Sequence, residues 1–174
     1  MVSSKRDSGR SPSTKDDEKG RKFGVTRLDK QTLENVGRSW VEGWNKHDAD
    51  EFARLFREDG EYMDTAFGAL RRGRDFMRRH HQLWHRAISG FRMVPERIIA
   101  GDSVVVVQAV GEGTFDGESL GGGKVVATGK TFRARLCAVL AIADDGKIAR
   151  CSEYCDRSLM PDGQQAPFHD LDHI

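Results

Sequence analysis

Long hydrophobic runs are absent from this 174-residue sequence, and so is an excess of charge of either sign. No apolar stretch approaches the roughly 20 residues that a membrane-spanning helix needs, and the polar N-terminus lacks the hydrophobic segment of a secretory signal. Lys and Arg number 28 against 27 for Asp and Glu, which argues against a protein that binds nucleic acid through phosphate contacts. We therefore expect a cytoplasmic protein with neither nucleic-acid nor membrane partners.

Cysteine is scarce as well. The three cysteines, Cys137, Cys151 and Cys155, are an odd number, which favours free thiols in a reducing compartment over a disulfide framework. Cysteines in strand-like segments usually behave as small buried hydrophobic residues. We expect no metal site from them, although a zinc site built on the three thiols is the alternative.

The length suits one domain with two tails. Residues 1–24 consist mostly of Ser, Lys, Arg, Asp and Gly, and so few apolar side chains cannot offset the entropy lost on ordering, which predicts a disordered tail. We assign residues 25–158 to the domain and residues 159–174, which contain Pro161, Gly163 and Pro167, to a C-terminal tail.

Helical patterns come first in the domain and strand patterns come last. Apolar residues from Leu28 to Trp44 recur at three- and four-residue steps and predict one helix. Asp48 is a plausible cap for a second short helix. Further segments predict a turn at Asp59-Gly60, a strand over 61–70, a third helix over 73–91, and strands over 91–100, 104–114, 128–142 and 147–156.

This order, without alternation of strands and helices, predicts an α+β fold. We expect a cone-shaped, curved antiparallel sheet wrapped around the N-terminal helices. Such a sheet leaves a conical hollow, and the side chains that face inward decide which molecule it holds.

Two segments have matching ends, because each reads as a turn followed by a short strand that closes on an aspartate. Asp59-Gly60 leads to Asp64, and Asp145-Gly146 leads to Asp156. Two acids in one apolar pocket can carry out proton transfer, since burial can separate their pKa values so that one acts as a base and the other as an acid. The alternative is that both acids face water at strand ends.

Several neighbours of these acids are candidates for substrate contact. Tyr62 and Tyr154 each stand two residues before an aspartate and share its face in a regular strand, and each can bind a substrate oxygen or simply pack. Of the adjacent His80 and His81, the one that faces the hollow can shuttle protons near neutral pH; we assign His81 to catalysis and His80 to binding.

His81 and His85 are one helical turn apart, a spacing that can hold a metal. No Glu lies between them in the arrangement of a zinc protease, so a partly exposed helix surface is the simpler interpretation. Four further residues, if they do not merely pack in the core, would form a soft, aromatic lining for a flat ligand: Trp44, Phe67, Met77 and Trp84.

The sequence resembles the nuclear transport factor 2-like superfamily, and within it the SnoaL-like polyketide cyclase family. The match extends over about residues 30–158, and the order and spacing of its short motifs are more specific than any one of them. The motifs are 44–48 (WNKHD), 55–60 (LFREDG), 62–64 (YMD), 113–117 (GTFDG), 128–131 (TGKT), 145–148 (DGKI) and 154–156 (YCD).

The resemblance implies roles for both aspartates. Asp64 occupies the position at which ketosteroid isomerases of the superfamily have their general base, but the oxyanion partners of that base would fall at Trp40 and near Ala138, which cannot replace them. Asp156 occupies the position of an acid in SnoaL-like cyclases and limonene epoxide hydrolases.

From these observations we expect an enzyme of the lyase or isomerase type that uses acid–base catalysis without cofactor or metal. Its substrate would be a small apolar, oxygenated or aromatic molecule, and cyclisation, isomerisation, dehydration and carbon–carbon cleavage all begin with the same proton transfer. The alternative is a non-catalytic binding or scaffold domain of the same fold. The resemblance also implies a homodimer.

Overall fold

The computed structural model describes residues 28–66 and 68–156. The expected tails at 1–24 and 159–174 lie outside the described residues, as does Phe67. Ten elements follow one another: α1 (Lys30–Asn45), α2 (Ala49–Arg54), β1 (Phe56–Asp64), β2 (Ala69–Arg72), α3 (Arg74–Ala87), β3 (Ile88–Gly101), β4 (Val104–Phe115), the 3-10 helix η1 (Gly121–Gly123), β5 (Thr131–Ile142) and β6 (Ile148–Cys155).

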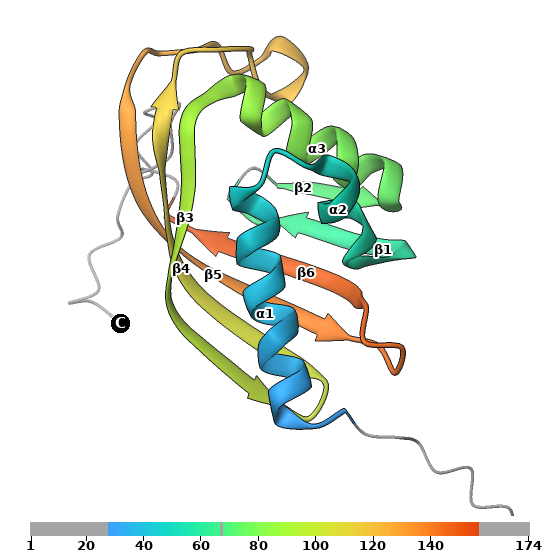
Figure 1. Cartoon of the computed structure of the whole chain (residues 1–174). Coiled ribbons are helices and arrows are strands. Elements are labelled where there is room, and N and C mark those ends of the chain that lie inside the picture. The colour runs from blue at the N-terminus through green and yellow to red at the C-terminus, as the bar shows by residue number, and fades with distance from the viewer. Residues whose placement is uncertain (1–27, 67, 157–174) are drawn as a thin grey trace, which may run out of the picture.

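The six strands form one curved sheet in the order β2-β1-β6-β5-β4-β3, and the helices lie on its concave side (Figure 1). Most neighbours are antiparallel, but β1 pairs with β6 in parallel. The α+β cone is therefore confirmed, while the sheet is mixed rather than wholly antiparallel. None of the helices in the described ranges is long and apolar enough to cross a membrane.

Several expected boundaries differ. Asp59-Gly60 is not a turn before a strand; it lies inside β1, where the pairing with β6 shifts register between Phe56 and Glu61. Such a bulge inserts unpaired residues without ending the strand, and Phe56 before it and Tyr62 and Asp64 after it are all buried. The strand expected over 61–70 is divided between β1 and β2. The third helix ends at Ala87 rather than Phe91, because Ile88 and the residues after it pair with β4.

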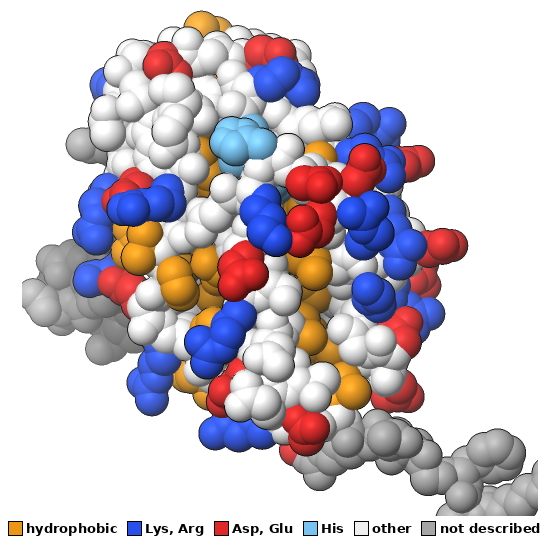
Figure 2. All heavy atoms as spheres, in the orientation of Figure 1, with side chains coloured by type: hydrophobic (Ala, Val, Ile, Leu, Met, Phe, Trp, Pro, Cys, Tyr) orange, Lys and Arg blue, Asp and Glu red, His pale blue; other side chains and the backbone are white. Residues whose placement is uncertain are grey.

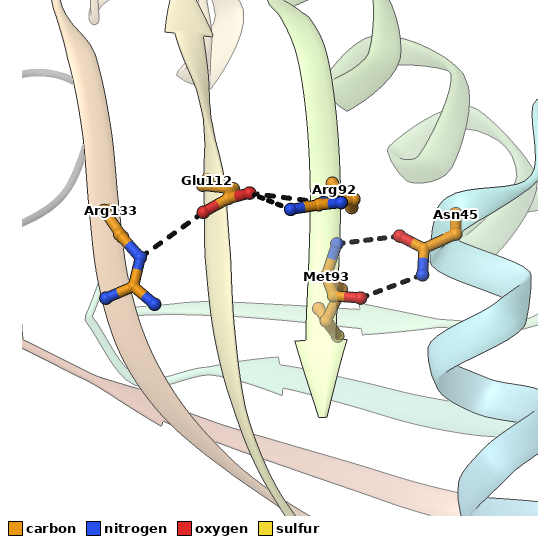
Figure 3. Close-up of polar contacts among 5 residues, drawn as sticks. All are labelled: Asn45, Arg92, Met93, Glu112 and Arg133. Carbon is orange, nitrogen blue, oxygen red and sulfur yellow. Dashed lines mark hydrogen bonds and ion pairs between the residues drawn. The ribbon is translucent and has the colours of Figure 1, made fainter. Parts of the chain in front are cut away.

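Helix α1 is attached to the sheet by its apolar side and by one side-chain amide. Asp29 caps its first turn by accepting a hydrogen bond from the Thr32 amide at 2.7 Å. At its other end, Asn45 donates to the Met93 carbonyl at 2.8 Å and accepts from the Met93 amide at 2.7 Å (Figure 3). Asn45 thus pairs with the backbone of the edge strand β3 as a neighbouring strand would, and it holds the end of α1 over the sheet.

The surface carries charges of both signs in close proximity, with no extended area of one sign on the face that Figure 2 shows. Glu112 on β4 illustrates the pattern, because it bridges Arg92 of β3 at 2.7 Å and Arg133 of β5 at 3.4 Å (Figure 3). Exposed pairs of this kind contribute little to stability, so the fold depends on the core.

The attachment of α1 yields a prediction. Asn45→Ala removes both hydrogen bonds to Met93 and leaves the backbone groups of Met93 without those partners, so we expect the free energy of unfolding to fall by about 1–3 kcal/mol. Urea unfolding followed by tryptophan fluorescence measures the loss. Asn35→Ala, which removes only an exposed bond to Gln31, should change stability by less than about 0.5 kcal/mol; equal losses in the two variants would contradict the role given to Asn45.

Candidate functional site

The parallel pairing of β1 with β6 brings two acids together. Tyr62 lies opposite Cys151, and Asp64 lies opposite Glu153. Side chains two residues apart in a strand share a face, and both Tyr62 and Asp64 are buried. The acid that the fold sets beside Asp64 is therefore Glu153.

Glu153 is held by a hydrogen bond and perturbed by burial. The Tyr62 hydroxyl donates to a carboxylate oxygen of Glu153. Burial, and then the negative charge of Asp64, raise the pKa of Glu153 to about 7, although the Tyr62 hydrogen bond and the Arg71 guanidinium act in the opposite direction. Burial likewise raises the pKa of Tyr62 well above its usual value, so Tyr62 remains a hydrogen-bond donor at neutral pH.

These groups face a narrow cavity, which we call the inner cavity. Its volume is about 30 Å³, which is enough for about one water molecule. Aromatic and aliphatic side chains predominate in its wall, which is formed by Trp44, Tyr62, Asp64, His80, Trp84, Phe91, Met93, Gly111, Phe132, Ala134, Leu136, Glu153 and Cys155.

A larger hollow, the outer basin, adjoins the inner cavity. Its volume is about 490 Å³, and it is lined by Asp64, Ala66, Ala69, Arg71, His80, Leu83, Trp84, Leu120, Gly121, Lys124 and Val125. Asp64, His80 and Trp84 line both spaces. A molecule in the outer basin therefore contacts Asp64 directly, whereas Glu153 lies beyond it in the inner cavity.

The connection between β4 and β5 forms one side of the outer basin. Its backbone is tied to the end of α3, because the Gly117 and Glu118 amides donate to the Ala87 and Arg86 carbonyls at 3.0 and 3.1 Å. A Cβ at Gly117 would lie 1.9 Å from the Arg86 oxygen, so the close approach requires glycine. Beyond this contact, Leu120, Gly121, Lys124 and Val125 line the outer basin.

Of the two adjacent histidines, His80 faces both spaces and His81 faces neither. Successive residues on a helix point about 100° apart, so only one of the two can face the hollow. Burial, followed by the nearby charges of Arg71 and His81, lowers the pKa of His80 well below its usual value. His80 is therefore neutral at pH 7 and can exchange hydrogen bonds with a ligand. The structure thus places His80 at the hollow, and not His81, the histidine that was expected there as the catalytic one.

His81 and His85 instead bind the end of α1. Their Nε2 atoms lie 2.9 Å from the Gly43 carbonyl and 3.0 Å from the Trp44 carbonyl. These are among the last carbonyls of a helix, which lack partners within the helix itself. Since Trp44 lines the inner cavity, the two histidines position part of its wall. Across residues 28–66 and 68–156, no group of three or more His, Cys, Asp or Glu side chains could hold a metal ion.

The structure does not bring Asp156 to Asp64. Asp156 follows the end of β6 and lines a separate surface hollow with Tyr154, Glu96 and Arg135. The reason is the two-residue period of a strand: Glu153 and Cys155 line the inner cavity, whereas Tyr154, which is 48% exposed, lies on the opposite face. The expected pairing of Asp64 with Asp156 is wrong in this structure, and so is the expected contact of Tyr154 with the hollow.

The remaining predicted residues divide as follows. Trp44, Tyr62, His80 and Trp84 line the inner cavity as expected. Met77 is fully buried but lines neither space, so it belongs to the core. Phe67 cannot be placed, because it lies outside the described residues.

Sequence reasoning did not single out Glu153, which lines the inner cavity, or Arg71 and Lys124, which line the outer basin. Glu153 carries a signal that can be recognised: an acid in the middle of a strand, flanked at two-residue spacing by Cys151 and Cys155. Its partner on the sheet depended on the parallel pairing, which no local pattern indicates. The three cysteines are free, as expected.

Comparisons with known proteins agree with this architecture. The family model for the SnoaL-like domain matches residues 38–151, more than half of the chain. Searches of curated proteins give no match, but many solved structures share the fold.

Three of these structures illustrate its range, and at this level of identity they show the fold alone. A candidate SnoaL-like polyketide cyclase from Jannaschia sp. CCS1 is 18% identical, with a TM-score of 0.64 over 73% of this chain and 87% of that one. An epoxide hydrolase from M. tuberculosis, of the LEH-like type, is 16% identical, with a TM-score of 0.61 over 78% and 91%. An NTF2-like protein from Burkholderia thailandensis is 16% identical, with a TM-score of 0.62 over 77% and 98%.

The histidines at the end of α1 yield a prediction about pH. Burial lowers the pKa of His85 from 6.5 to about 4, so between these values the unfolded chain binds a proton that the folded chain does not. Stability contributed by neutral His85 is thus lost as pH falls from 6.5 towards 4. Wild type should therefore lose unfolding free energy between pH 7.5 and pH 5. His85→Gln, which keeps a side-chain donor but does not titrate, should make this loss smaller by about 1 kcal/mol. The figure is below the value that the full pKa shift implies, because His85 is partly exposed and solvent screens its charge. Urea unfolding at the two pH values measures it, and an unchanged loss would contradict the assignment.

Proposed function

The chain belongs to the SnoaL-like domain family, and we propose that it is a general acid–base enzyme that moves a proton on a small, largely apolar, oxygenated molecule. The observation that carries this proposal is the pair of carboxyl groups, Asp64 and Glu153, that β1 and β6 set side by side in a narrow cavity lined mainly by aromatic and aliphatic side chains. The SnoaL-like fold is shared with isomerases, cyclases and epoxide hydrolases, and with proteins of unknown function. Acid–base chemistry is common to these reactions.

The two acids have different roles in this proposal. Two neighbouring carboxyl groups in an apolar site do not both ionise readily, so the pair holds one proton near neutral pH. Glu153, with a pKa of about 7, carries that proton, and Asp64 is the ionised base. Asp64 also lies on the wall that both spaces share, where it reaches a molecule bound in the outer basin.

The first step is proton abstraction next to a carbonyl group. The Asp64 carboxylate takes the proton, and the electron pair of the broken C–H bond moves into the substrate to form an enolate. Glu153 gives its own proton to the enolate oxygen or to a second carbon, which completes a tautomerisation or isomerisation. Passage of the abstracted proton from Asp64 to Glu153 then restores the starting state. Cyclisation and elimination would begin with the same abstraction.

The aromatic residues of the wall supply donors for a substrate oxygen. The indole N–H groups of Trp44 and Trp84 are buried and have no hydrogen-bond partner among the described residues. A buried donor without an acceptor costs free energy, and a bound carbonyl or enolate oxygen would supply one. His80, neutral and on the shared wall, is a further partner for that oxygen.

The small volume of the inner cavity favours a second candidate, a binding domain without chemistry. A space of about 30 Å³ accepts only an edge of a substrate, so a ligand could occupy the outer basin alone. The two functions differ in one property: the binding domain takes up ligands without exchanging their protons.

The acid–base proposal predicts loss of proton exchange in an Asp64 variant. The wild-type protein should accelerate replacement of the α-protons of 2-tetralone by deuterium in D₂O, followed by ¹H NMR. Asp64→Asn should lower the rate by about 10²–10⁴-fold, because the base is gone. Glu61→Gln is the matched control, since Glu61 lies on the same strand but pairs with Arg72 and Arg150 outside the cavity; it should retain the wild-type rate. Full exchange by Asp64→Asn would overturn the proposed mechanism.

The role of Glu153 as the acid predicts a pH dependence. The exchange rate should fall as pH rises through about 7, because Glu153 then loses its proton. The Tyr62 hydrogen bond lowers the pKa of Glu153, so Tyr62→Phe should raise this pKa and move the falling limb to higher pH. A pH–rate profile of both proteins, corrected for uncatalysed exchange, makes the test. A limb that stays in place or moves to lower pH would contradict the coupling.

A further inference from the structure

We propose that Arg71 and Lys124 form an anion-binding subsite in the outer basin, and that the substrate is a small apolar or aromatic molecule carrying a carboxylate. This inference deepens the proposed function and rests on it, because the bound carboxylate is a substrate only if the protein is an enzyme. The binding of a carboxylate, however, can be measured independently of any reaction.

The pairing of β2 with β1 directs Arg71 into the basin. Arg71 lies opposite Tyr62 in the antiparallel register, and paired residues share a face of the sheet. Arg71 and Ala69 accordingly line the outer basin, whereas the alternate residues Leu70 and Arg72 are exposed. The two adjacent arginines of β2 therefore point to opposite faces.

Arg71 differs from its neighbours because it forms no ion pair with any residue that the structure describes. Arg72 forms an ion pair with Glu61 at 2.7 Å, and Arg74 lies 3.6 Å from Glu58. No ion pair of Arg71 occurs within the part of the chain that the structure describes, and its Nη1 atom is buried without a hydrogen-bond partner. A buried guanidinium nitrogen without an acceptor is costly, and a carboxylate matches its geometry through two parallel hydrogen bonds.

Lys124 supplies a second positive charge at the basin. It follows η1 in the connection between β4 and β5, the segment that hydrogen bonds tie to the end of α3. Among residues 28–66 and 68–156 it has no ion pair either. Two cations from different elements thus converge on one hollow, while Leu83, Leu120 and Val125 give the same hollow apolar surface.

The position of the acids orients the ligand. Asp64 lies on the wall shared with the inner cavity and repels an anion, so the carboxylate belongs at the Arg71 and Lys124 side of the basin. The apolar body then extends towards Asp64, His80 and Trp84. Arg71 also lies near enough to the reacting groups to lower the pKa of both Glu153 and His80, so a carboxylate bound there sits next to the acid pair.

The test compares two probes of nearly the same shape, one anionic and one neutral. 2-Naphthoate and 2-naphthamide are titrated into the full-length protein at pH 7.5, and dissociation constants are measured by isothermal titration calorimetry. We expect wild type to bind the naphthoate about tenfold more tightly than the amide, the factor that about 1.4 kcal/mol of charge-assisted hydrogen bonding provides. Arg71→Gln should abolish most of this preference and Lys124→Gln should reduce it, whereas the matched control Arg72→Gln should retain it.

Three results would overturn the subsite: equal affinity of wild type for the two probes, binding of neither, or a naphthoate preference that survives in both Arg71→Gln and Lys124→Gln. Should Arg71→Gln fail to fold, as judged by circular dichroism, loss of preference in Lys124→Gln supports the subsite and an undiminished preference there overturns it. Failure of the proposed function looks different. In that case Asp64→Asn retains proton exchange, while the naphthoate preference and its dependence on Arg71 are unaffected.

Discussion

The parallel pairing of β1 with β6 is the constraint on which the rest of the site depends. This pairing joins strands that are far apart in the sequence, and its register places Asp64 beside Glu153 and Tyr62 beside Cys151. A shift of one residue would turn Glu153 to the outer face. Tyr62 and Asp64, which follow the bulge between Phe56 and Glu61, are both buried. The acid pair is thus a product of the topology of the sheet and not of either strand alone.

At Glu153, burial and the charge of Asp64 act on the pKa against the hydrogen bond from Tyr62 and the charge of Arg71. Enclosure by aromatic side chains favours the neutral form of a carboxyl group, and the charge of Asp64 adds to that effect on Glu153. Tyr62 and Arg71 stabilise the ionised form and limit the shift, so the pKa of Glu153 remains near neutrality. The helices maintain this environment. Asn45 holds α1 on β3, and the side chains of His81 and His85 contact the two consecutive carbonyls of Gly43 and Trp44 at the end of α1. The core and the site are therefore built from the same contacts.

The sequence was sufficient to predict the fold but only half of the acid pair. Periodicity located α1 and the long strands, because apolar spacing reports directly on burial, and Asp64 could be chosen because it closes a recognisable strand. Asp156 was chosen by the same argument, yet it lies after the end of β6 at a different hollow, and the acid of β6 that lines the inner cavity is Glu153. Which of two adjacent strand residues faces the cavity depends on the register of the strand in the sheet, and pairing with strands distant in the sequence decides that register. His80 and His81 pose the same problem on a helix, and Arg71 can be distinguished from Arg72 only once β2 is placed beside β1.

The central claim is that Glu153 retains a proton near neutral pH because it is buried beside Asp64. The most direct test is an NMR titration of the protein with ¹³C-labelled glutamate side-chain carboxyl groups, in which the Glu153 resonance is assigned by its absence from Glu153→Gln. The account predicts that this carbon titrates with a pKa of about 7, well separated from the exposed glutamates, and that Asp64→Asn lowers that value. Titration of Glu153 near 4.5, the ordinary value for glutamate, would contradict it.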